Sequence, residues 1–228
     1  MTLEENIKIV KDLFNEDTES LDVIRYLNEY FPDIKSIKDI DRVVTKEYLE
    51  YEEKIEREVI RYNSIWSKIN DKYYDKLIKY LNTDWDKNRL NIDALVGLIP
   101  VFPRFLDSYS FAVSTNLSEE KIREVTAHET LHFLWFKKWM ELYPDTRREE
   151  LDSPNLIWKY SEIVTYSILN SKEFLSFNFN EKGYESFYKL YDKNNKLIIK
   201  ELKNIYDKDI IIEDKIKEGY DYIKGEIK

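Results

Sequence analysis

The feature that most constrains the fold is a stretch from Thr45 to about Leu81 that contains neither glycine nor proline. Within it, apolar and aromatic residues recur at steps of three or four, which is the spacing of one face of an α-helix. The residues of this stripe are Tyr48, Tyr51, Ile55, Val59, Tyr62, Ile65, Ile69, Tyr73 and Leu77. The pattern predicts one long amphipathic helix, straight or kinked, in a chain built mainly from helices.

Shorter helical patterns lie on both sides of this stretch. They predict two helices between Thr2 and about Phe31, and single helices at about 118–139, 153–170, 184–206 and 212–227. We therefore divide the chain into an N-terminal helical region (1–83), a core (84–171) and a C-terminal helical region (172–228). The length suits one compact unit, and we expect the three regions to pack together as one.

Strand signals are confined to the residues between the two longest helical patterns. They occur at Ala94–Phe105, which Pro100 and Pro103 interrupt, and at Ser110–Thr115. Because proline has no backbone donor, the segment with the two prolines should lie at a sheet edge or a bend. We therefore predict a helix-dominated α+β fold with a small antiparallel sheet of about three or four strands.

Charge and composition exclude several classes of partner. The formal net charge is -9, and the lysines alternate with acidic residues instead of forming a basic block, so we expect no nucleic-acid partner. Glu4, Glu5, Lys8 and Lys11 interrupt the region where a signal peptide needs an apolar core, and no apolar run has membrane-spanning length. The absence of cysteine fits a reducing compartment. We expect a cytoplasmic protein without a membrane partner.

The chain contains only two histidines, and both lie in the predicted helix at 118–139. His128 and His132 are four residues apart, so their imidazoles share one helix face and can bind one zinc ion, each at about 2.0 to 2.1 Å. Glu129 lies beside them, where its carboxylate can take a proton from a water molecule at the metal. The sequence therefore predicts one zinc ion per chain.

Glu162 is the candidate for the third zinc ligand. Its helix is apolar on nearly every side, with Leu156, Ile157, Trp158, Tyr160, Ile163, Val164, Tyr166, Ile168 and Leu169. A carboxylate in a buried helix is costly unless it is paired or bound to a cation. A salt bridge to Lys159 or to a distant arginine is the alternative explanation. Four weaker rivals as ligands lie around Pro144: Glu141, Glu149, Glu150 and Asp152.

Residues 125–134, which contain His128-Glu129-Thr130-Leu131-His132 between uncharged neighbours, resemble the zincin metallopeptidases. Because no histidine follows in the sequence, the resemblance implies the gluzincin subgroup, in which a glutamate on a second helix is the third ligand. That glutamate would be Glu162. The chain departs from the subgroup nearby: Ser161 and Tyr166 stand where an asparagine and a small or acidic residue that supports a histidine are usual.

The resemblance implies a hydrolase whose catalytic core is residues 84–171 and whose general base is Glu129. Tyr166, one turn beyond the third ligand, and Tyr109 are candidates for the donor that stabilises an oxyanion. The strand before the motif helix would be the edge that pairs with an extended substrate, through Ser110, Phe111, Ala112 and Val113. An ordinary core strand is the alternative for these four residues.

Three functions remain open on the sequence alone. The first, which we favour, is a small intracellular metallopeptidase acting on a peptide or protein. The second is a helical interaction protein that binds zinc without catalysis and uses the stretch 45–81 as its surface; it requires a fourth protein ligand, and Glu129→Gln would not change its function. The third is a zinc hydrolase of a non-peptide substrate, which would differ in the shape of its pocket.

Overall fold

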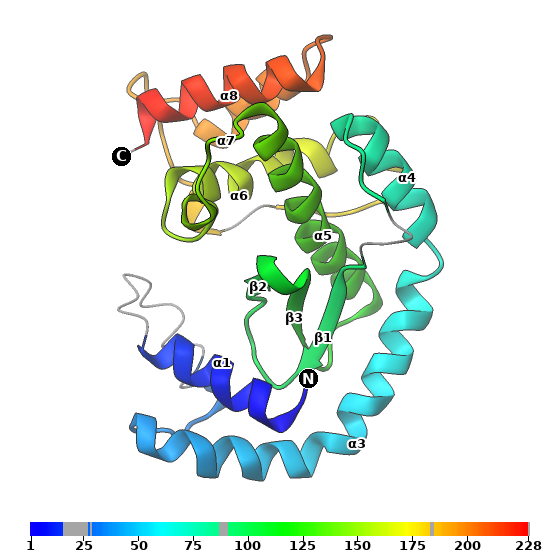
Figure 1. Cartoon of the computed structure of the whole chain (residues 1–228), viewed down its shortest axis with the longest axis vertical. Helices are drawn as coiled ribbons and strands as arrows, with labels where there is room; N and C mark the ends of the chain where they lie inside the picture. Colours follow the sequence, from blue (N-terminus) through cyan, green and yellow to red (C-terminus); the bar gives the residue numbers. More distant parts are fainter. Residues whose placement is uncertain (16–26, 28, 87–90, 183–184, 228) are drawn as a thin grey trace. The chain divides into compact units, whose positions relative to one another are not determined.

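The computed structural model describes residues 1–15, 27, 29–86, 91–182 and 185–227. This part of the chain has a helix-dominated α+β fold, with seven α-helices and one three-stranded sheet (Figure 1). It forms two compact units: Met1–Lys68 with Asn91–Val125, and Ile69–Leu90 with Thr126–Lys228. Each unit combines segments that are distant in sequence, so the units do not follow the three predicted regions.

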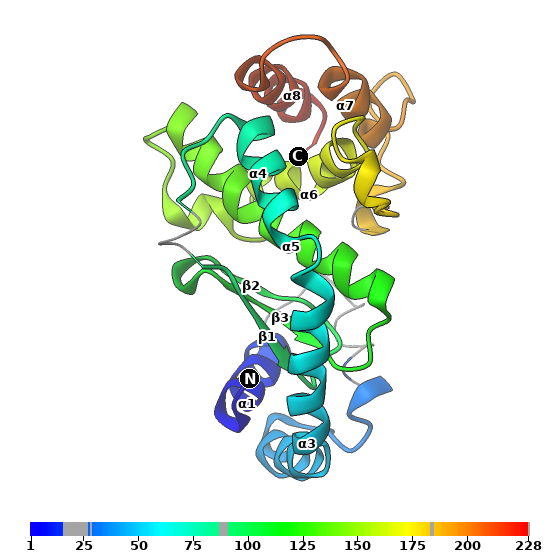
Figure 2. The ribbon, with the colours of Figure 1, turned by 90° about the vertical axis from the view of Figure 1, so that its right-hand side faces the viewer.

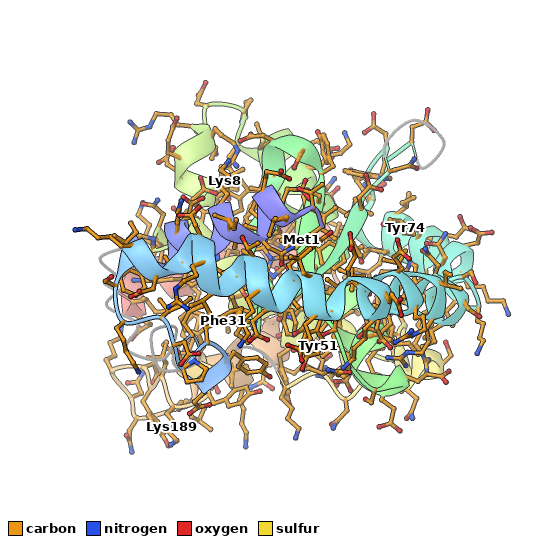
Figure 3. The ribbon with its side chains drawn as sticks, turned by 90° about the horizontal axis from the view of Figure 1, so that it is seen from below. Met1, Lys8, Phe31, Tyr51, Tyr74 and Lys189 are labelled. Carbon is orange, nitrogen blue, oxygen red and sulfur yellow. The ribbon has the colours of Figure 1, made fainter. Side chains whose placement is uncertain are left out.

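The first unit contains α1 (Leu3–Asn15) and α3 (Ile40–Trp66), which lie against each other (Figure 3). Each helix buries the apolar face that its periodicity predicts, with Ile9, Val10, Val43, Val44, Ile55, Tyr62 and Ile65 in the core. The N-terminus is fixed to the sheet, because the Met1 ammonium group donates a hydrogen bond to the Val96 carbonyl oxygen at 2.8 Å.

Three short strands form a mixed sheet in the first unit: β1 (Asp93–Gly97), β2 (Arg104–Phe105) and β3 (Ser110–Ser114), in the order β1-β3-β2. β1 runs parallel to β3, and β2 runs antiparallel to it. The prediction of an antiparallel sheet is therefore wrong for β1, because the chain reverses through the proline segment and forms β2 before it enters β3. The predicted edge position of the proline segment is confirmed, since Pro103 leads into β2 at the sheet edge.

β3 lies in the centre of the sheet, so its predicted position at the edge is wrong. All five of its residues are buried, and it pairs with β1 on one side and with β2 on the other. Ser110, Phe111, Ala112 and Val113 therefore do not form an unpaired edge strand. The physical reason is visible in the sequence: a run without charged residues marks a strand that is covered by the rest of the fold.

The predicted helix at 45–81 is divided into two helices. α3 ends at Trp66, and α4 (Asn70–Leu81) begins after a short turn. The apolar stripe continues across the turn, but its first part is buried in the first unit, whereas Tyr73, Tyr74, Leu77 and Leu81 are buried in the second. The periodicity predicts helical structure correctly. The break arises because the apolar residues of the two halves are buried in different cores.

The second unit is helical and contains α4, most of α5 (Glu119–Leu142), α6 (Leu156–Leu169), α7 (Ile198–Tyr206) and α8 (Ile212–Glu226). α6 packs against α7, and α7 against α8 (Figure 2). The predicted helix at 184–206 is too long, because its α-helical part begins at Ile198 in the described chain. No helix of the described residues is both long and apolar enough to span a membrane.

Candidate metal site

The two histidines lie in the part of α5 that belongs to the second unit. The helix begins beside Ser118, whose hydroxyl oxygen accepts the Lys121 backbone N–H at 3.0 Å, and it continues through both histidines. The spacing of four residues places the imidazoles of His128 and His132 one turn apart, with ring centroids separated by 4.8 Å. His132 is completely buried, and His128 is partly exposed.

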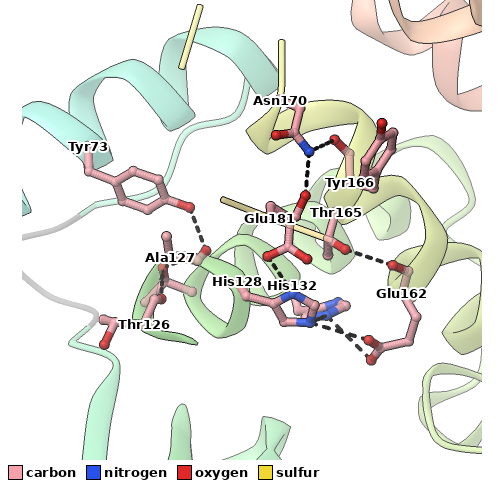
Figure 4. A network of polar contacts seen from close by, with 11 residues as sticks. Tyr73, Thr126, Ala127, His128, His132, Glu162, Thr165, Tyr166, Asn170 and Glu181 are labelled. Carbon is pink, nitrogen blue, oxygen red and sulfur yellow. Dashed lines mark hydrogen bonds and ion pairs between the residues drawn. The ribbon is translucent and has the colours of Figure 1, made fainter. Parts of the chain in front are cut away.

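Glu162 approaches the imidazoles from α6, which has the most apolar sequence of the described α-helices. Because this helix is buried on nearly all sides, the Glu162 side chain is only 8% exposed. Its Oε2 lies 3.3 Å from Nε2 of His128, and its Oε1 lies 3.4 Å from Nε2 of His132 (Figure 4). The two imidazoles and the carboxylate therefore converge from two helices on one point.

The distances between the three donor groups fit a zinc ion. The Nε2 atoms of the two histidines are 3.1 Å apart, so the three separations range from 3.1 to 3.4 Å. Tetrahedral ligands at the usual zinc distances are about 3.3 Å from one another. Within the described part of the chain, no fourth His, Asp or Glu joins this group of three. Three protein ligands with one remaining position are typical of catalytic zinc sites.

Glu129 lies directly after His128 on α5, and its side chain is buried. It is outside the group of converging donors. Its negative charge nevertheless acts on His128 and contributes to raising the pKa of that imidazole. A buried carboxylate next to the ligands, but not among them, is the arrangement that a general base in a zinc site requires.

The structure adds one residue that the sequence did not indicate, Glu181. Its Oε2 lies 3.3 Å from Nδ1 of His128, on the side of the ring opposite to the converging donors (Figure 4). No helical or strand periodicity marks the segment after Ser171, and Glu181 is one of many acidic residues in the chain. A histidine that binds a metal through one nitrogen needs a hydrogen-bond partner at the other nitrogen. This requirement predicts that such a partner exists, but it does not indicate which residue it is.

The carboxylates around His128 control its protonation in the metal-free protein. Burial lowers the pKa of His128, but the carboxylates of Glu181, Glu162 and Glu129 outweigh burial and hold this pKa well above its ordinary value. Without a bound cation, these carboxylates therefore favour the protonated form of the His128 imidazole. Binding of a divalent cation would replace this proton, since the ligand form of histidine is neutral at the nitrogen that binds.

Comparisons with known proteins do not identify a relative. No protein-family model matches the chain, and neither the curated proteins nor the solved structures contain a match. The geometry and chemistry of the site therefore give the indication of function.

The other residues predicted for the site have different positions. The Tyr166 ring points away from the imidazoles in Figure 4, so it is not directed towards the converging donors. Tyr109 belongs to the first unit, as does β3. The rival ligands around Pro144 lie outside the group of three. Three of them form ion pairs with other residues: Glu141 with Lys137, Glu150 with Arg147, and Asp152 with Arg148.

Proposed function

We propose that this protein is a zinc-dependent hydrolase, and more specifically a small metallopeptidase of the zincin type with glutamate as its third ligand. The observation that carries the proposal is the convergence of His128, His132 and Glu162 at mutual distances of 3.1 to 3.4 Å, with Glu129 buried beside them. A purely structural zinc site would need a fourth protein ligand, and the described residues supply three.

Each residue of the site has a distinct chemical task in this proposal. The imidazoles of His128 and His132 and the carboxylate of Glu162 hold the cation. Zinc, when bound, polarises a carbonyl group and makes a water molecule acidic enough to attack near neutral pH. Glu129 takes the proton of the attacking water and transfers it to the leaving amine.

The charge of the site favours a neutral substrate group over an anionic one. Glu162 is a candidate ligand, Glu181 contacts the far nitrogen of His128, and Glu129 is buried next to His128 in the sequence, so three carboxylates belong to the site of one divalent cation. Three carboxylates carry more charge than one divalent cation neutralises, which disfavours phosphate esters and other anions as substrates. An amide carbonyl carries no net charge, so the peptide bond of a peptide or protein is the substrate that we propose.

Metal content tests the ligand assignment. We expect the purified protein to retain about one zinc ion per chain after dialysis, and Glu162→Ala to lose it, because two imidazoles alone hold the ion weakly. Glu150→Ala makes the same change in the acidic segment near Pro144 and should keep the metal, since Glu150 pairs with Arg147. Absence of zinc from the wild-type protein would refute the proposed function.

Catalysis is tested separately with Glu129→Gln. This variant should retain zinc, because Glu129 is not a ligand, and should hydrolyse peptides at least about 100-fold more slowly, because the proton acceptor is lost. The measurement is mass spectrometry of a mixed peptide library incubated with the zinc-loaded wild type or variant. Cleavage at equal rates would exclude Glu129 as the base. A zinc-loaded wild type that cleaves no peptide would favour the alternative of zinc binding without peptidase activity.

A further inference from the structure

Glu181 contacts the nitrogen of His128 that does not face the other ligands. Nε2 of this ring lies 3.1 Å from His132 and 3.3 Å from Glu162, whereas Nδ1 lies 3.3 Å from Oε2 of Glu181. An imidazole that binds a metal through Nε2 carries its proton on Nδ1. Nδ1–H must then donate to the Glu181 carboxylate, which fixes both the tautomer and the orientation of the ring.

We propose that Glu181 is the positioning residue of the metal site, and that the segment from Ser171 to Lys182 is a structural part of that site. This inference rests on the proposed zinc function. The resemblance to gluzincins predicts a supporting group on the helix of the third ligand, where Tyr166 stands in this chain. Glu181 supplies the supporting carboxylate from outside that helix.

The backbone of Glu181 is tied to the end of α6. The Asn170 side-chain amide donates to the Glu181 carbonyl oxygen at 2.8 Å and to the Tyr166 carbonyl oxygen at 2.9 Å (Figure 4). One side chain thus connects the helix that carries Glu162 to the residue that orients His128. The backbone of the positioning residue is therefore anchored to the end of the helix that carries the third ligand.

Aromatic packing holds the rest of the segment. The Tyr73 ring lies 5.9 Å from the ring of Phe174, 5.7 Å from that of Phe177 and 5.8 Å from that of Phe179, each in an edge-to-face arrangement. The hydroxyl of the same tyrosine donates to the carbonyl oxygen of Ala127, the residue before His128, at 2.6 Å. The segment from Ser171 to Lys182 therefore packs on a side chain that also contacts the ligand helix.

The Glu181 carboxylate is buried to nearly the same degree as that of the third ligand, with 8% of its side chain exposed. A buried carboxylate is retained at a cost unless it is paired with a positive charge or a strong donor. His128 supplies that donor. This mutual dependence is the reason to assign Glu181 to the site and not to the surface.

Zinc affinity tests the inference. We expect Glu181→Gln to bind zinc about 10- to 100-fold more weakly than the wild type, because a neutral amide accepts the hydrogen bond from Nδ1–H of His128 less strongly than a carboxylate does. Competition with a chromophoric chelator measures the affinity. Glu173→Gln is the matched control: it removes the same charge from the same segment, where Glu173 approaches Lys172 at 4.0 Å, and should bind zinc like the wild type. Equal affinities of the two variants would overturn the proposal.

A second measurement separates positioning from general damage to the fold. The chain has only two histidines, so NMR of isotope-labelled imidazole nitrogens reports on His128 directly. In the zinc-loaded wild type we expect Nδ1–H of His128 to be strongly hydrogen-bonded and slow to exchange, and Glu181→Gln to weaken that signature. Glu181→Asp, which keeps the charge with a shorter reach, should give an intermediate affinity.

The outcomes for the two proposals are distinguishable. If the wild type binds no zinc, the proposed function fails. If the wild type binds zinc and Glu181→Gln changes neither the affinity nor the Nδ1–H signal of His128, the zinc site stands and the positioning role of Glu181 is refuted.

Discussion

At the scale of single residues, the turn of α5 before His128 is held by side chains as well as by the helix itself. The Ala127 carbonyl oxygen accepts hydrogen bonds from the hydroxyls of Tyr73 at 2.6 Å and Thr130 at 3.2 Å, and Thr130 also donates to the Thr126 carbonyl oxygen at 2.6 Å. Burial raises the pKa of Tyr73 well above its ordinary value, so this hydroxyl keeps its proton and acts as a donor.

Tyr73→Phe should lower the free energy of unfolding by about 0.5 to 1.5 kcal/mol, the usual contribution of one hydrogen bond. The loss should be modest because the Ala127 carbonyl keeps its contact with Thr130 and the ring keeps its aromatic neighbours. Urea denaturation of the metal-free protein measures the effect. Tyr191→Phe, at an exposed position, is the control and should change stability by less than about 0.5 kcal/mol. A loss above the predicted range would mean that the hydroxyl supports more than this turn.

At the scale of helices, a charge cluster joins three helical segments of the second unit. Lys138 of α5 is buried, and its ammonium group lies 2.5 Å from Oε1 of Glu213 on α8. The Asn82 side chain, just after α4, donates to the same Glu213 oxygen at 2.8 Å, and the Asn82 carbonyl oxygen accepts from Lys138 at 2.8 Å. The buried ammonium group of Lys138 therefore has a carboxylate and a carbonyl oxygen as partners at the point where the three helical segments meet.

Glu213 should make stability depend on pH in the acid range. Burial raises the pKa of Glu213, but hydrogen bonds from Lys138 and Asn82 outweigh burial and hold it below its ordinary value of 4.5. A carboxyl whose pKa is lowered by folding stabilises the protein above its unfolded pKa, and this contribution disappears as the pH falls through the folded pKa. We expect Glu213→Gln to cost about 1 to 2 kcal/mol near neutral pH and much less well below pH 4.5.

Denaturation of the metal-free protein at several pH values measures this difference. Glu218→Gln removes a charge from an exposed position of the same helix, where Glu218 pairs with Lys208, and should show almost no difference at any pH. A difference between the wild type and Glu213→Gln that stays constant from neutral to acidic pH would contradict the predicted linkage.

At the scale of the whole molecule, all three candidate ligands and the positioning residue belong to the second unit, although α5 begins in the first. Zinc stabilises only those conformations in which its ligands are assembled. Hydrogen exchange with and without zinc should therefore show the larger gain in protection within α6 and the adjoining part of α5. The gain there should reach about 100-fold when free zinc is 100 times the dissociation constant.

Amides of α1 and β1, in the first unit, should gain much less protection than those of α6. An equal gain in both units would contradict this expectation, because it would mean that the molecule opens as one cooperative unit. Cadmium at the same saturation is a useful second ion, since the same donors should bind it and protect the same helices.

The helices and the candidate ligands could be predicted from the sequence because their signals are local. A spacing of four residues places His128 and His132 on one face of any helix that contains them, whatever the rest of the fold. An acidic residue within a helix that is apolar on nearly every side has to meet a cation or a donor, which singled out Glu162. The apolar stripe of α3 and α4 likewise follows from the helical period of the sequence.

How these elements meet depends on contacts between residues that are distant in the sequence. The parallel pairing of β1 with β3, and the central position of β3, depend on the path of the chain between the strands, and that path has no periodic signal. The break between α3 and α4 arises because one stripe is buried in two cores. Glu181 reaches His128 through contacts with Asn170 and an aromatic cluster, and pairings of this kind depend on proximity in space between residues that are distant in sequence.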